Sequence, residues 1–471
     1  MENSRGAQAS KMGLVSLVFN TIGMSLGGAI VSYLGYAIGY GGRSTIFTVI
    51  ICLLMGIGLA LPFYLLGKLA LVKGSQYSII MENLGPKIGG LTQYIYLTDI
   101  LFYATYPLAI SSYIVSLFPG LNKTVVAIGI VLLVYVILIN SIEGLARFQS
   151  LFTIILLIAL TLYSIIGVYY LINNNINPFN FNDANYFYNG MDGITAGIPL
   201  LIFYTFGYYY ILYYGPVAKQ PTRNIPKAML IGGGTMIVTW LFVTIVGANV
   251  LPVEQVANQP LTIVAEEIMP KSLAILFLIG GPIMAILTSY LGLVPVTMGG
   301  ILQTAKEGWF PKVFTKKSKK GTPFVIYTVI QGVVLLIVLL RIPIIALLYQ
   351  FAFITAITSV ILYIALLRLP AKHPELFDRA GVKVTKFFFK VVSIIAIVFA
   401  LVIFYYSVQG VSFIQVLINV GLIALLYMIS NYLVNSGKVN VEENLEMDVE
   451  VTEPRSGEVI EEPLLNEQPK M

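Results

Sequence analysis

The feature that most constrains this chain is a series of about twelve long apolar runs, each able to cross the roughly 30 Å of hydrocarbon in a bilayer. The runs lie near residues 13–38, 44–66, 88–117, 123–141, 148–173, 194–215, 228–250, 272–302, 322–341, 343–368, 387–409 and 411–434. Residues 341–343 are the only break that divides the stretch 322–368 into two full spans. Only 11% of the residues are charged and 58% are hydrophobic, which excludes a soluble domain of this length. We therefore predict an all-α integral membrane protein with twelve transmembrane helices.

The distribution of Lys and Arg predicts how these helices are oriented. With a cytoplasmic N-terminus, only four of the 28 Lys and Arg residues lie outside, namely Arg43, Lys123, Lys271 and Arg341. The others lie inside, including clusters within 306–320 and 368–390, as the positive-inside rule expects. Both termini are therefore predicted to be cytoplasmic, and the loop 174–193, which has no Lys or Arg, is predicted to be external.

Glycines interrupt two of the runs at about mid-membrane depth. Gly23, Gly27 and Gly28 lie in the first run, and Gly207 lies between aromatic residues in the sixth. In lipid, unpaired backbone is tolerated only where it lines a cavity, so we interpret both interruptions as breaks that form a binding site. Amides at the start of a half-helix favour an anion there, and carbonyls at the end of one favour a cation. The alternative is that these small residues only let helices pack closely.

Interrupted helices five apart predict an inverted repeat of five plus five helices, the LeuT-like arrangement, followed by two C-terminal helices. The predicted segments are a cytoplasmic N-terminal segment at 1–12, a first repeat at 13–173, a second repeat at 194–368, the last two helices at 387–434 and a cytoplasmic tail at 436–471. The tail is acidic and is expected to be disordered. The first run follows a short polar head and precedes no small-residue cleavage pattern, so we expect a retained helix and not a signal peptide.

The chain has a single cysteine, Cys52, and a single histidine, His373. This excludes disulfides within the chain, thiolate metal clusters and Ser-His-Asp or Cys-His catalysis. We expect a protein that is not an enzyme and has no catalytic residues, no cofactor and no nucleic-acid partner. A channel or a structural membrane protein has a similar composition but would lack paired broken helices.

Three ordered blocks of sequence resemble one family. Residues 215–228 carry a P-x-R-x-I-P-x-A pattern formed by Pro221, Arg223, Ile225, Pro226 and Ala228. The other blocks are 23–30 in helix 1 and 305–314 after helix 8, followed by Gly-Thr-Pro at 321–323. Together they resemble the amino acid–polyamine–organocation permeases over nearly the whole chain. The resemblance implies secondary active transport of amino acids across the plasma membrane by alternating access.

The resemblance also implies where an amino acid would bind. Backbone amides of Gly27, Gly28 and Ala29 in helix 1 would hold its carboxylate, and carbonyls of helix 6 would hold its ammonium. The candidate residues in helix 6 are Phe203, Tyr204, Thr205, Phe206 and Gly207, with a hydroxyl added by Thr205. For Phe203 and Tyr204 the alternative is aromatic packing.

Two titratable residues that many members of the family carry are absent. A glutamate after the helix 6 glycine is replaced by Tyr209, and a lysine in helix 5 is replaced by Leu156. The resemblance implies instead a sodium site with oxygen ligands. Its predicted ligands are the hydroxyls of Thr288 and Ser289 and the carbonyls of Gly23, Leu26 and Ala285. The alternative is that the hydroxyls bond back to their own helix. We therefore expect sodium coupling or plain exchange.

Asp99 is a carboxylate in a predominantly apolar run, with Tyr103 and Tyr106 on nearly the same helical face. A charge near mid-membrane costs on the order of 3 kcal/mol, so we expect Asp99 to face a cavity or a partner. It is a candidate proton carrier, or the counter-charge for a cationic substrate, and Asp99 and Tyr103 are both predicted as substrate-binding residues. The second role defines an alternative function, a polyamine or cationic amino acid carrier that uses Asp99. The competing interpretation places Asp99 at a helix end that faces water.

Overall fold

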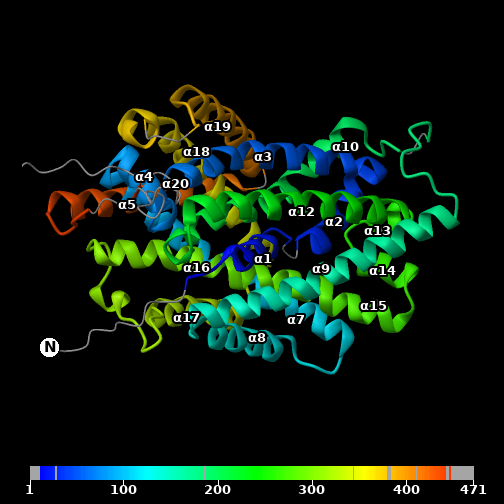
Figure 1. The fold of residues 1–471 in the computed structure, drawn as a ribbon. Helices are drawn as coiled ribbons and strands as arrows, with labels where there is room; N and C mark the ends of the chain where they lie inside the picture. The colour runs from blue at the N-terminus through cyan, green and yellow to red at the C-terminus, as the bar shows by residue number, and fades with distance from the viewer. Residues whose placement is uncertain are drawn as a thin grey trace, which may run out of the picture.

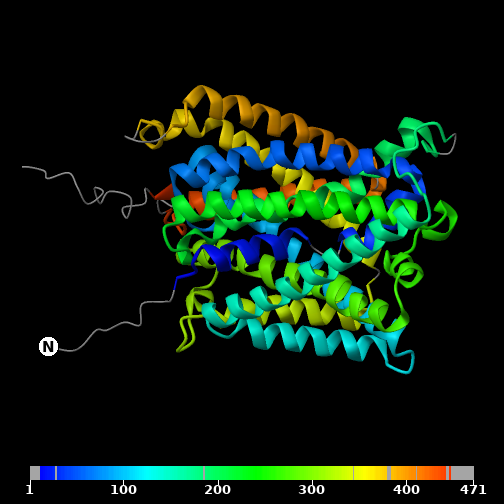
Figure 2. The ribbon, with the colours of Figure 1, turned by 45° about the vertical axis from the view of Figure 1, so that its right-hand side comes forward.

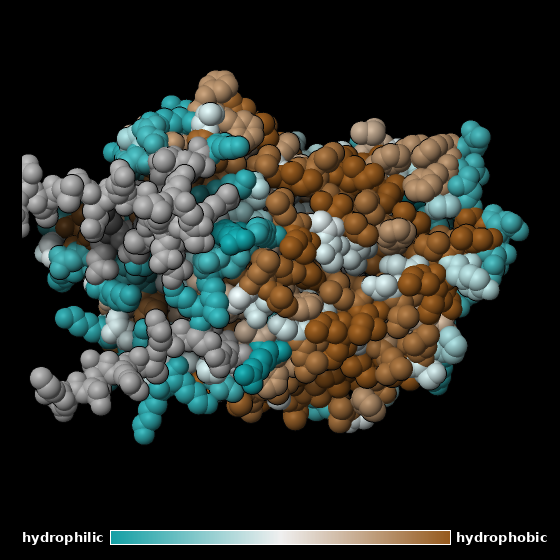
Figure 3. All heavy atoms as spheres, viewed as in Figure 1, coloured by the Kyte–Doolittle hydropathy of each residue, from teal (hydrophilic) through white to brown (hydrophobic). Residues whose placement is uncertain are grey.

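The computed structural model describes residues 11–26, 29–183, 186–342, 344–378, 383–409, 411–441 and 445–446. Its long helices run side by side along one direction (Figures 1 and 2). On the face shown in Figure 3, apolar side chains form a broad belt between two polar ends. This is the surface of a multi-pass membrane protein, because lipid would cover the belt and water the two ends.

The first half of the chain supplies the helices of the first five predicted spans. They are α1 (Leu14–Ser25), α2 (Ala29–Gly41), η1 (Gly42–Ser44), α3 (Thr45–Leu69), α4 (Ser75–Leu84), α5 (Pro86–Leu97), α6 (Asp99–Phe102), α7 (Thr105–Leu117), α8 (Lys123–Leu138) and α9 (Ile142–Asn173). Helix 1 is therefore formed by α1 and α2, and helix 3 by α5, α6 and α7. A short strand, β1 (Leu71–Val72), precedes α4.

The second half supplies the remaining helices. They are α10 (Gly190–Ala196), α11 (Ile198–Leu201), η2 (Ile202–Thr205), η3 (Gly207–Val217), α12 (Pro221–Asn249), α13 (Val253–Val256), α14 (Thr262–Ile268), α15 (Lys271–Leu278), η4 (Ile279–Ile283), α16 (Met284–Lys306), η5 (Lys312–Thr315), α17 (Phe324–Leu340), α18 (Ile344–Lys372), η6 (Pro374–Leu376), α19 (Lys386–Gln409) and α20 (Phe413–Asn435). Helix 6 runs from α10 to η3, and helix 8 from α15 to α16. A second strand, β2, covers Leu445–Glu446.

Helices cover each of the twelve predicted runs. Within the described residues, eight helical stretches are long and apolar enough to cross a membrane, and three shorter apolar helices, α1, α8 and α17, add to them. The number of twelve spans and the inverted repeat remain predictions. The predicted division of 322–368 is confirmed, since α17 ends at Leu340 and α18 begins at Ile344. Between them, Arg341 has a φ of 54°, in the left-handed region that ends a helix.

The basic segments gather at one end of the molecule. The turn between α16 and α17, the turn between α18 and α19 and the start of α12 lie at the left end in Figure 1, whereas the loop between α9 and α10 lies at the right end with α13 and α14. In that loop Asp183 pairs with Arg43 at 2.9 Å. The predicted cytoplasmic and external loops therefore lie at opposite ends of the fold. Which end faces the cytoplasm remains a prediction from the charge distribution.

At the basic end, α4 is fastened to helix 8 by buried hydrogen bonds. Ser75 Oγ donates to the carbonyl oxygen of Val296 at 2.6 Å. The Tyr77 hydroxyl donates to the Glu307 carboxylate and accepts a hydrogen bond of 2.8 Å from Trp309 Nε1. Burial raises the pKa of Tyr77, and the nearby Glu307 carboxylate adds to the rise, so this hydroxyl stays neutral and donates.

The chain crosses this same end after α20, in a segment that we name the C-terminal strap, residues 437–441 and 445–446. Strand β2 pairs with β1 in antiparallel register, and the Leu445 amide donates to Glu82 Oε1 at 2.9 Å. The Asn440 amide donates to the Glu307 carbonyl oxygen at 2.9 Å, and Val439 packs on the Tyr77–Trp309 cluster. The prediction of a disordered tail from 436 onwards differs from the structure at these residues, because apolar side chains and backbone pairing hold the strap against α4 and helix 8.

Candidate functional site

Helix 1 is broken where the glycines predict it. Helix α1 ends at Ser25, and the Leu26 amide still bonds to the Ile22 carbonyl oxygen, whereas α2 begins at Ala29. Gly27 and Gly28 lie outside the described residues. The last carbonyls of α1 and the first amides of α2 are therefore the helix-end groups on either side of Gly27 and Gly28. These groups carry opposite partial charges, which suits a ligand that has both a cationic and an anionic group.

Helix 6 is irregular at the same level of the fold. The α-helix ends at Leu201, one 3₁₀ segment covers Ile202–Thr205, Phe206 forms a bend, and a second 3₁₀ segment begins at Gly207. A tighter 3₁₀ helix leaves backbone carbonyls with poorer hydrogen-bond geometry than an α-helix. The predicted break in helix 6 is therefore confirmed as a change of helix type around Phe206.

The two breaks touch through the backbone. A Cβ atom built on Gly207 would lie 2.2 Å from the Met24 carbonyl oxygen and 2.9 Å from the Ser25 Cα atom. Glycine is therefore the residue that lets helix 6 approach the end of α1 this closely. Because Met24 and Ser25 precede the gap in helix 1, this contact brings the two predicted halves of the binding site together.

The predicted side chains of helix 6 have other contacts. Thr205 Oγ1 donates to the Ile202 carbonyl oxygen at 2.7 Å, and Thr205 packs on Gly56 of α3. The Phe206 ring is buried, with its centroid 5.7 Å from that of Tyr209. The side chains of Ala29, Phe203 and Tyr204 lie outside the described residues. The hydroxyl that Thr205 was predicted to offer to a substrate is therefore bonded within its own helix.

The predicted sodium site lies where α1 packs on α16. Ser289 Oγ donates to the Gly23 carbonyl oxygen at 3.3 Å, so two of the predicted ligands are neighbours. Thr288 Oγ1 donates to the carbonyl oxygens of Met284 at 2.8 Å and Ala285 at 3.1 Å, which is the alternative that the sequence left open. Leu26 is buried at the end of α1. The sodium site itself remains a prediction.

Two residues of α9 also lie between α1 and α16. They were not predicted from the sequence. Gln149 Nε2 donates to the Thr288 carbonyl oxygen at 2.9 Å, and Thr153 Oγ1 donates to the Phe19 carbonyl oxygen at 3.1 Å. Both side chains would lie 2.6 Å from a Cβ at Gly23. Gln149 Oε1 is buried and has no hydrogen-bond partner among the described residues. A polar face of α9 therefore closes the region between α1 and α16, whereas Leu156 is fully buried in the apolar core.

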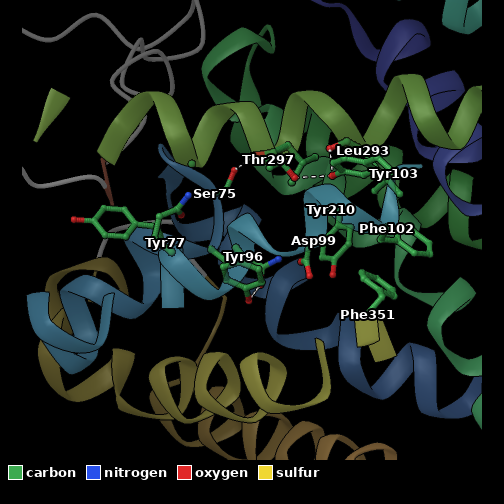
Figure 4. A pocket seen from close by; sticks show the side chains of 14 residues that line it. Ser75, Tyr77, Tyr96, Asp99, Phe102, Tyr103, Tyr210, Leu293, Thr297 and Phe351 are labelled. Carbon is green, nitrogen blue, oxygen red and sulfur yellow. Dashed lines mark hydrogen bonds between the residues drawn. The ribbon is translucent and has the colours of Figure 1, made fainter. Parts of the chain in front are cut away.

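A second site is a cavity of about 70 Å³ between helices 3, 6, 8 and 10 and the short helix α4. Figure 4 shows the side chains of Asp99 and Tyr210 next to each other near its centre, with the pair formed by Tyr103 and Thr297 above them in this view. Its lining comprises Ser75, Gln76, Tyr77, Gln93, Tyr96, Asp99, Phe102, Tyr103, Tyr210, Leu293, Val296, Thr297, Gly300 and Phe351. Asp99 and Tyr103 of the predicted site are among its described lining residues.

The breaks in helix 3 place Asp99 in this cavity. Helix α5 ends at Leu97 and α7 begins at Thr105, and the residues between them form the short helix α6 and turns. Asp99 Oδ1 is buried and has no hydrogen-bond partner among the described residues. Asp99 lies within the candidate span Pro86–Leu117, so the structure favours the predicted cavity over the competing position at a helix end in water.

Hydrogen bonds and ring stacking hold the polar groups around Asp99. The Tyr103 hydroxyl donates to the Leu293 carbonyl oxygen at 3.2 Å and lies 2.6 Å from Thr297 Oγ1. Tyr106 stacks on Tyr290 with ring centroids 5.1 Å apart. The Tyr96 hydroxyl donates to Gln76 Oε1 of α4. These partners were not selected from the sequence, although Tyr96, Asp99, Tyr103 and Tyr106 follow the spacing of one helical face.

Comparison with known proteins identifies the class of membrane protein. A family model described as "Amino acid permease" matches residues 12–435. The chain belongs to the amino acid permease family. The permease is 24% identical over 352 residues to a D-serine/D-alanine/glycine transporter of Escherichia coli O6:H1, covering 67% of this chain and 71% of that one. It is 23% identical over 352 residues to the D-serine/D-alanine/glycine transporter of Escherichia coli K12, with the same coverage.

This membership confirms the resemblance drawn from the three sequence blocks. It also indicates that the permease is a transporter rather than an enzyme. The matched residues end at 435, the last residue of α20, so the C-terminal strap lies beyond the part of the chain that the family shares.

Proposed function

We propose that this permease is a secondary active transporter that moves small amino acids across the plasma membrane by alternating access. Its substrate would bind where the broken helices 1 and 6 meet. The observation that carries the proposal is the backbone contact of Gly207 with Met24 and Ser25, because it joins two half-helix ends in a buried place. The printed names of the relatives, transporters of D-serine, D-alanine and glycine, support a small substrate.

The chemistry of the gap matches the two charges that every amino acid carries. The amides that begin α2 at Ala29 would hold the carboxylate, since the start of a helix carries partial positive charge. Carbonyls at the end of α1 and around Phe206 would hold the ammonium, since the last carbonyls of a helix have no intrahelical partner and a 3₁₀ helix bonds its carbonyls less well. Recognition through the backbone explains why the predicted site is formed by glycine and small residues instead of charged side chains.

Alternating access would use the contacts that already surround helix 1. Helix α1 packs on α9, α12, α16 and η3, so both the second half of helix 6 and helix 8 rest directly on it. A substrate that bridges α1, α2 and helix 6 would draw these elements together and close the path on one side. The predicted sodium ligands lie on the same contact between α1 and α16, so an ion bound there would stabilise one of the two arrangements.

The experiment is uptake of radiolabelled amino acids by proteoliposomes that contain the purified permease. We expect saturable uptake of glycine, alanine or serine, competed by an excess of the same unlabelled compound. Uptake that is not saturable would indicate a channel, and uptake of polyamines or of Lys and Arg alone would indicate the alternative carrier. Imposed sodium and proton gradients, applied separately, then identify the driving ion.

A further inference from the structure

We propose that the Asp99 cavity is a proton-binding site and that proton transfer through Asp99 drives the transport. The proposal rests on the transport function proposed above and names its coupling ion. Among the described residues that line the cavity, Asp99 is the only Asp or Glu, and there is no Lys, Arg or His. Its Oδ1 atom is buried without a hydrogen-bond donor in the described part of the chain.

A charged carboxylate is unfavourable in these surroundings. Three tyrosine hydroxyls lie close enough to the Asp99 carboxyl group to interact with it electrostatically. They belong to Tyr96 and Tyr103 of helix 3 and to Tyr210 of η3. The hydroxyls of Tyr96 and Tyr103 are already hydrogen-bonded elsewhere, to Gln76, Leu293 and Thr297. Among the described side chains of α18, the Phe351 ring lines the cavity, stacked on Phe102 with ring centroids 3.9 Å apart. A bound proton lowers the cost of holding a carboxyl group that has no cationic partner among the described lining residues, so we assign the neutral form to Asp99 here.

The cavity also offers a route for the proton to leave. Its floor at the basic end is α4, which contributes Ser75, Gln76 and Tyr77. The floor is held by the bonds from Ser75 to Val296 and from Tyr77 to Glu307. When α4 separates from helix 8, water reaches Asp99, the carboxylate becomes the favoured form, and the proton passes to that water. Reprotonation follows when the cavity opens to the other side, so each cycle carries one proton with the substrate.

The site is linked to the substrate site through helix 6. Tyr210 lies in the same 3₁₀ segment that begins at Gly207, and Gly207 contacts the end of α1. A change in helix 6 on substrate binding therefore moves one wall of the cavity. Because they share helix 6, the substrate and the proton can both shift the equilibrium between the two arrangements of the transporter. This is the requirement for coupling.

The cavity volume favours a proton over a cationic substrate. About 70 Å³ admits a few water molecules, since each requires on the order of 10–15 Å³ of such space. The described residues that line the cavity come from helices 3, 6, 8 and 10 and α4.

The test uses the full-length permease in liposomes that contain a pH-sensitive dye and a known internal substrate. Asp99→Asn mimics the protonated side chain, and Asp99→Glu keeps the carboxyl group. Asp192→Asn is the matched control, since Asp192 is an exposed acid at the opposite end, in α10. Three quantities are measured for each variant, namely accumulation driven by an inward proton gradient, acidification of the lumen on substrate addition, and exchange of labelled for unlabelled substrate without a gradient.

The wild type and Asp192→Asn should accumulate substrate and acidify the lumen. Asp99→Asn should lose about tenfold or more of the gradient-driven accumulation and all acidification, while its exchange stays within about threefold of wild type, because the substrate site is intact. Asp99→Glu should restore part of the acidification. If Asp99→Asn does not fold, the role of Asp99 is tested by the pH dependence of uptake in Asp99→Glu.

Other results would overturn the proposal. These are acidification by Asp99→Asn at the wild-type rate, wild-type accumulation driven by sodium without proton movement, or loss in Asp99→Asn of exchange for cationic substrates alone. Wild-type exchange without any proton movement would leave the transport function standing and refute only the role of Asp99. Absence of exchange for every amino acid would instead refute the transport function.

Discussion

Gly207 allows the close backbone contact between helices 1 and 6. In Gly207→Ala the new methyl group would lie 2.2 Å from the Met24 carbonyl oxygen, so the two backbones must separate. We expect a loss of about 1–3 kcal/mol in the free energy of unfolding, the usual cost of overpacking, together with a lower melting temperature of the purified protein. Gly234→Ala is the matched control, because nothing lies within 4 Å of a Cβ there. A melting temperature as high in Gly207→Ala as in the control would contradict the close approach.

Thr205 provides a second test at the residue scale. Its hydroxyl bonds to Ile202 at 2.7 Å, so Thr205→Val should cost about 1 kcal/mol of stability and leave the KM for uptake within about twofold. Thr235→Val removes a similar bond, of 2.9 Å to Ile231, from the exposed face of α12 and serves as the control. A rise in KM confined to Thr205→Val would assign the hydroxyl to the substrate, as the sequence suggested.

The contribution of the C-terminal strap to stability can be measured by truncation. Truncation after residue 435 removes the β1–β2 pairing and the bond from Asn440 to Glu307, whereas truncation after residue 446 keeps both. We expect the shorter protein to melt several degrees lower, since the loss of a few hydrogen bonds and a packed Val439 costs on the order of 2–3 kcal/mol. The longer protein should melt like the full chain. Equal melting temperatures for the two truncations would show that the strap adds no stability.

The elements differ in how well the sequence predicts them. Long apolar runs and the glycines near 27 and at 207 predict the helices and both breaks, because lipid imposes length and penalises unpaired backbone. The break in helix 3 carries no such signal, since residues 97–104 contain neither Gly nor Pro. There the tertiary bond from Tyr103 to helix 8 accompanies a local loss of helix. The partners of Asp99, and the polar face of α9 with Gln149 and Thr153, likewise depend on contacts between distant elements.

At the scale of the whole molecule, the charge distribution makes a prediction about orientation. The only cysteine, Cys52, is fully buried, so cysteines introduced at exposed positions can be labelled selectively. We expect a membrane-impermeant maleimide to label Asn180→Cys in intact cells, because the loop 174–193 is predicted to be external. Lys317→Cys, in the basic loop after helix 8, should react only after the cells are opened. The reverse pattern would show that the basic end faces outward.

The measurement that tests the central claim most directly is equilibrium binding of a labelled amino acid to the purified permease, with competition by blocked derivatives. Glycine, alanine or serine should compete, whereas the methyl ester and the N-acetyl derivative of the same amino acid should each lose about tenfold or more in affinity, because each removes one charge that the half-helix ends would bind. Binding of the ester or the N-acetyl derivative as tight as that of the free amino acid would contradict a site formed by the backbone of broken helices 1 and 6.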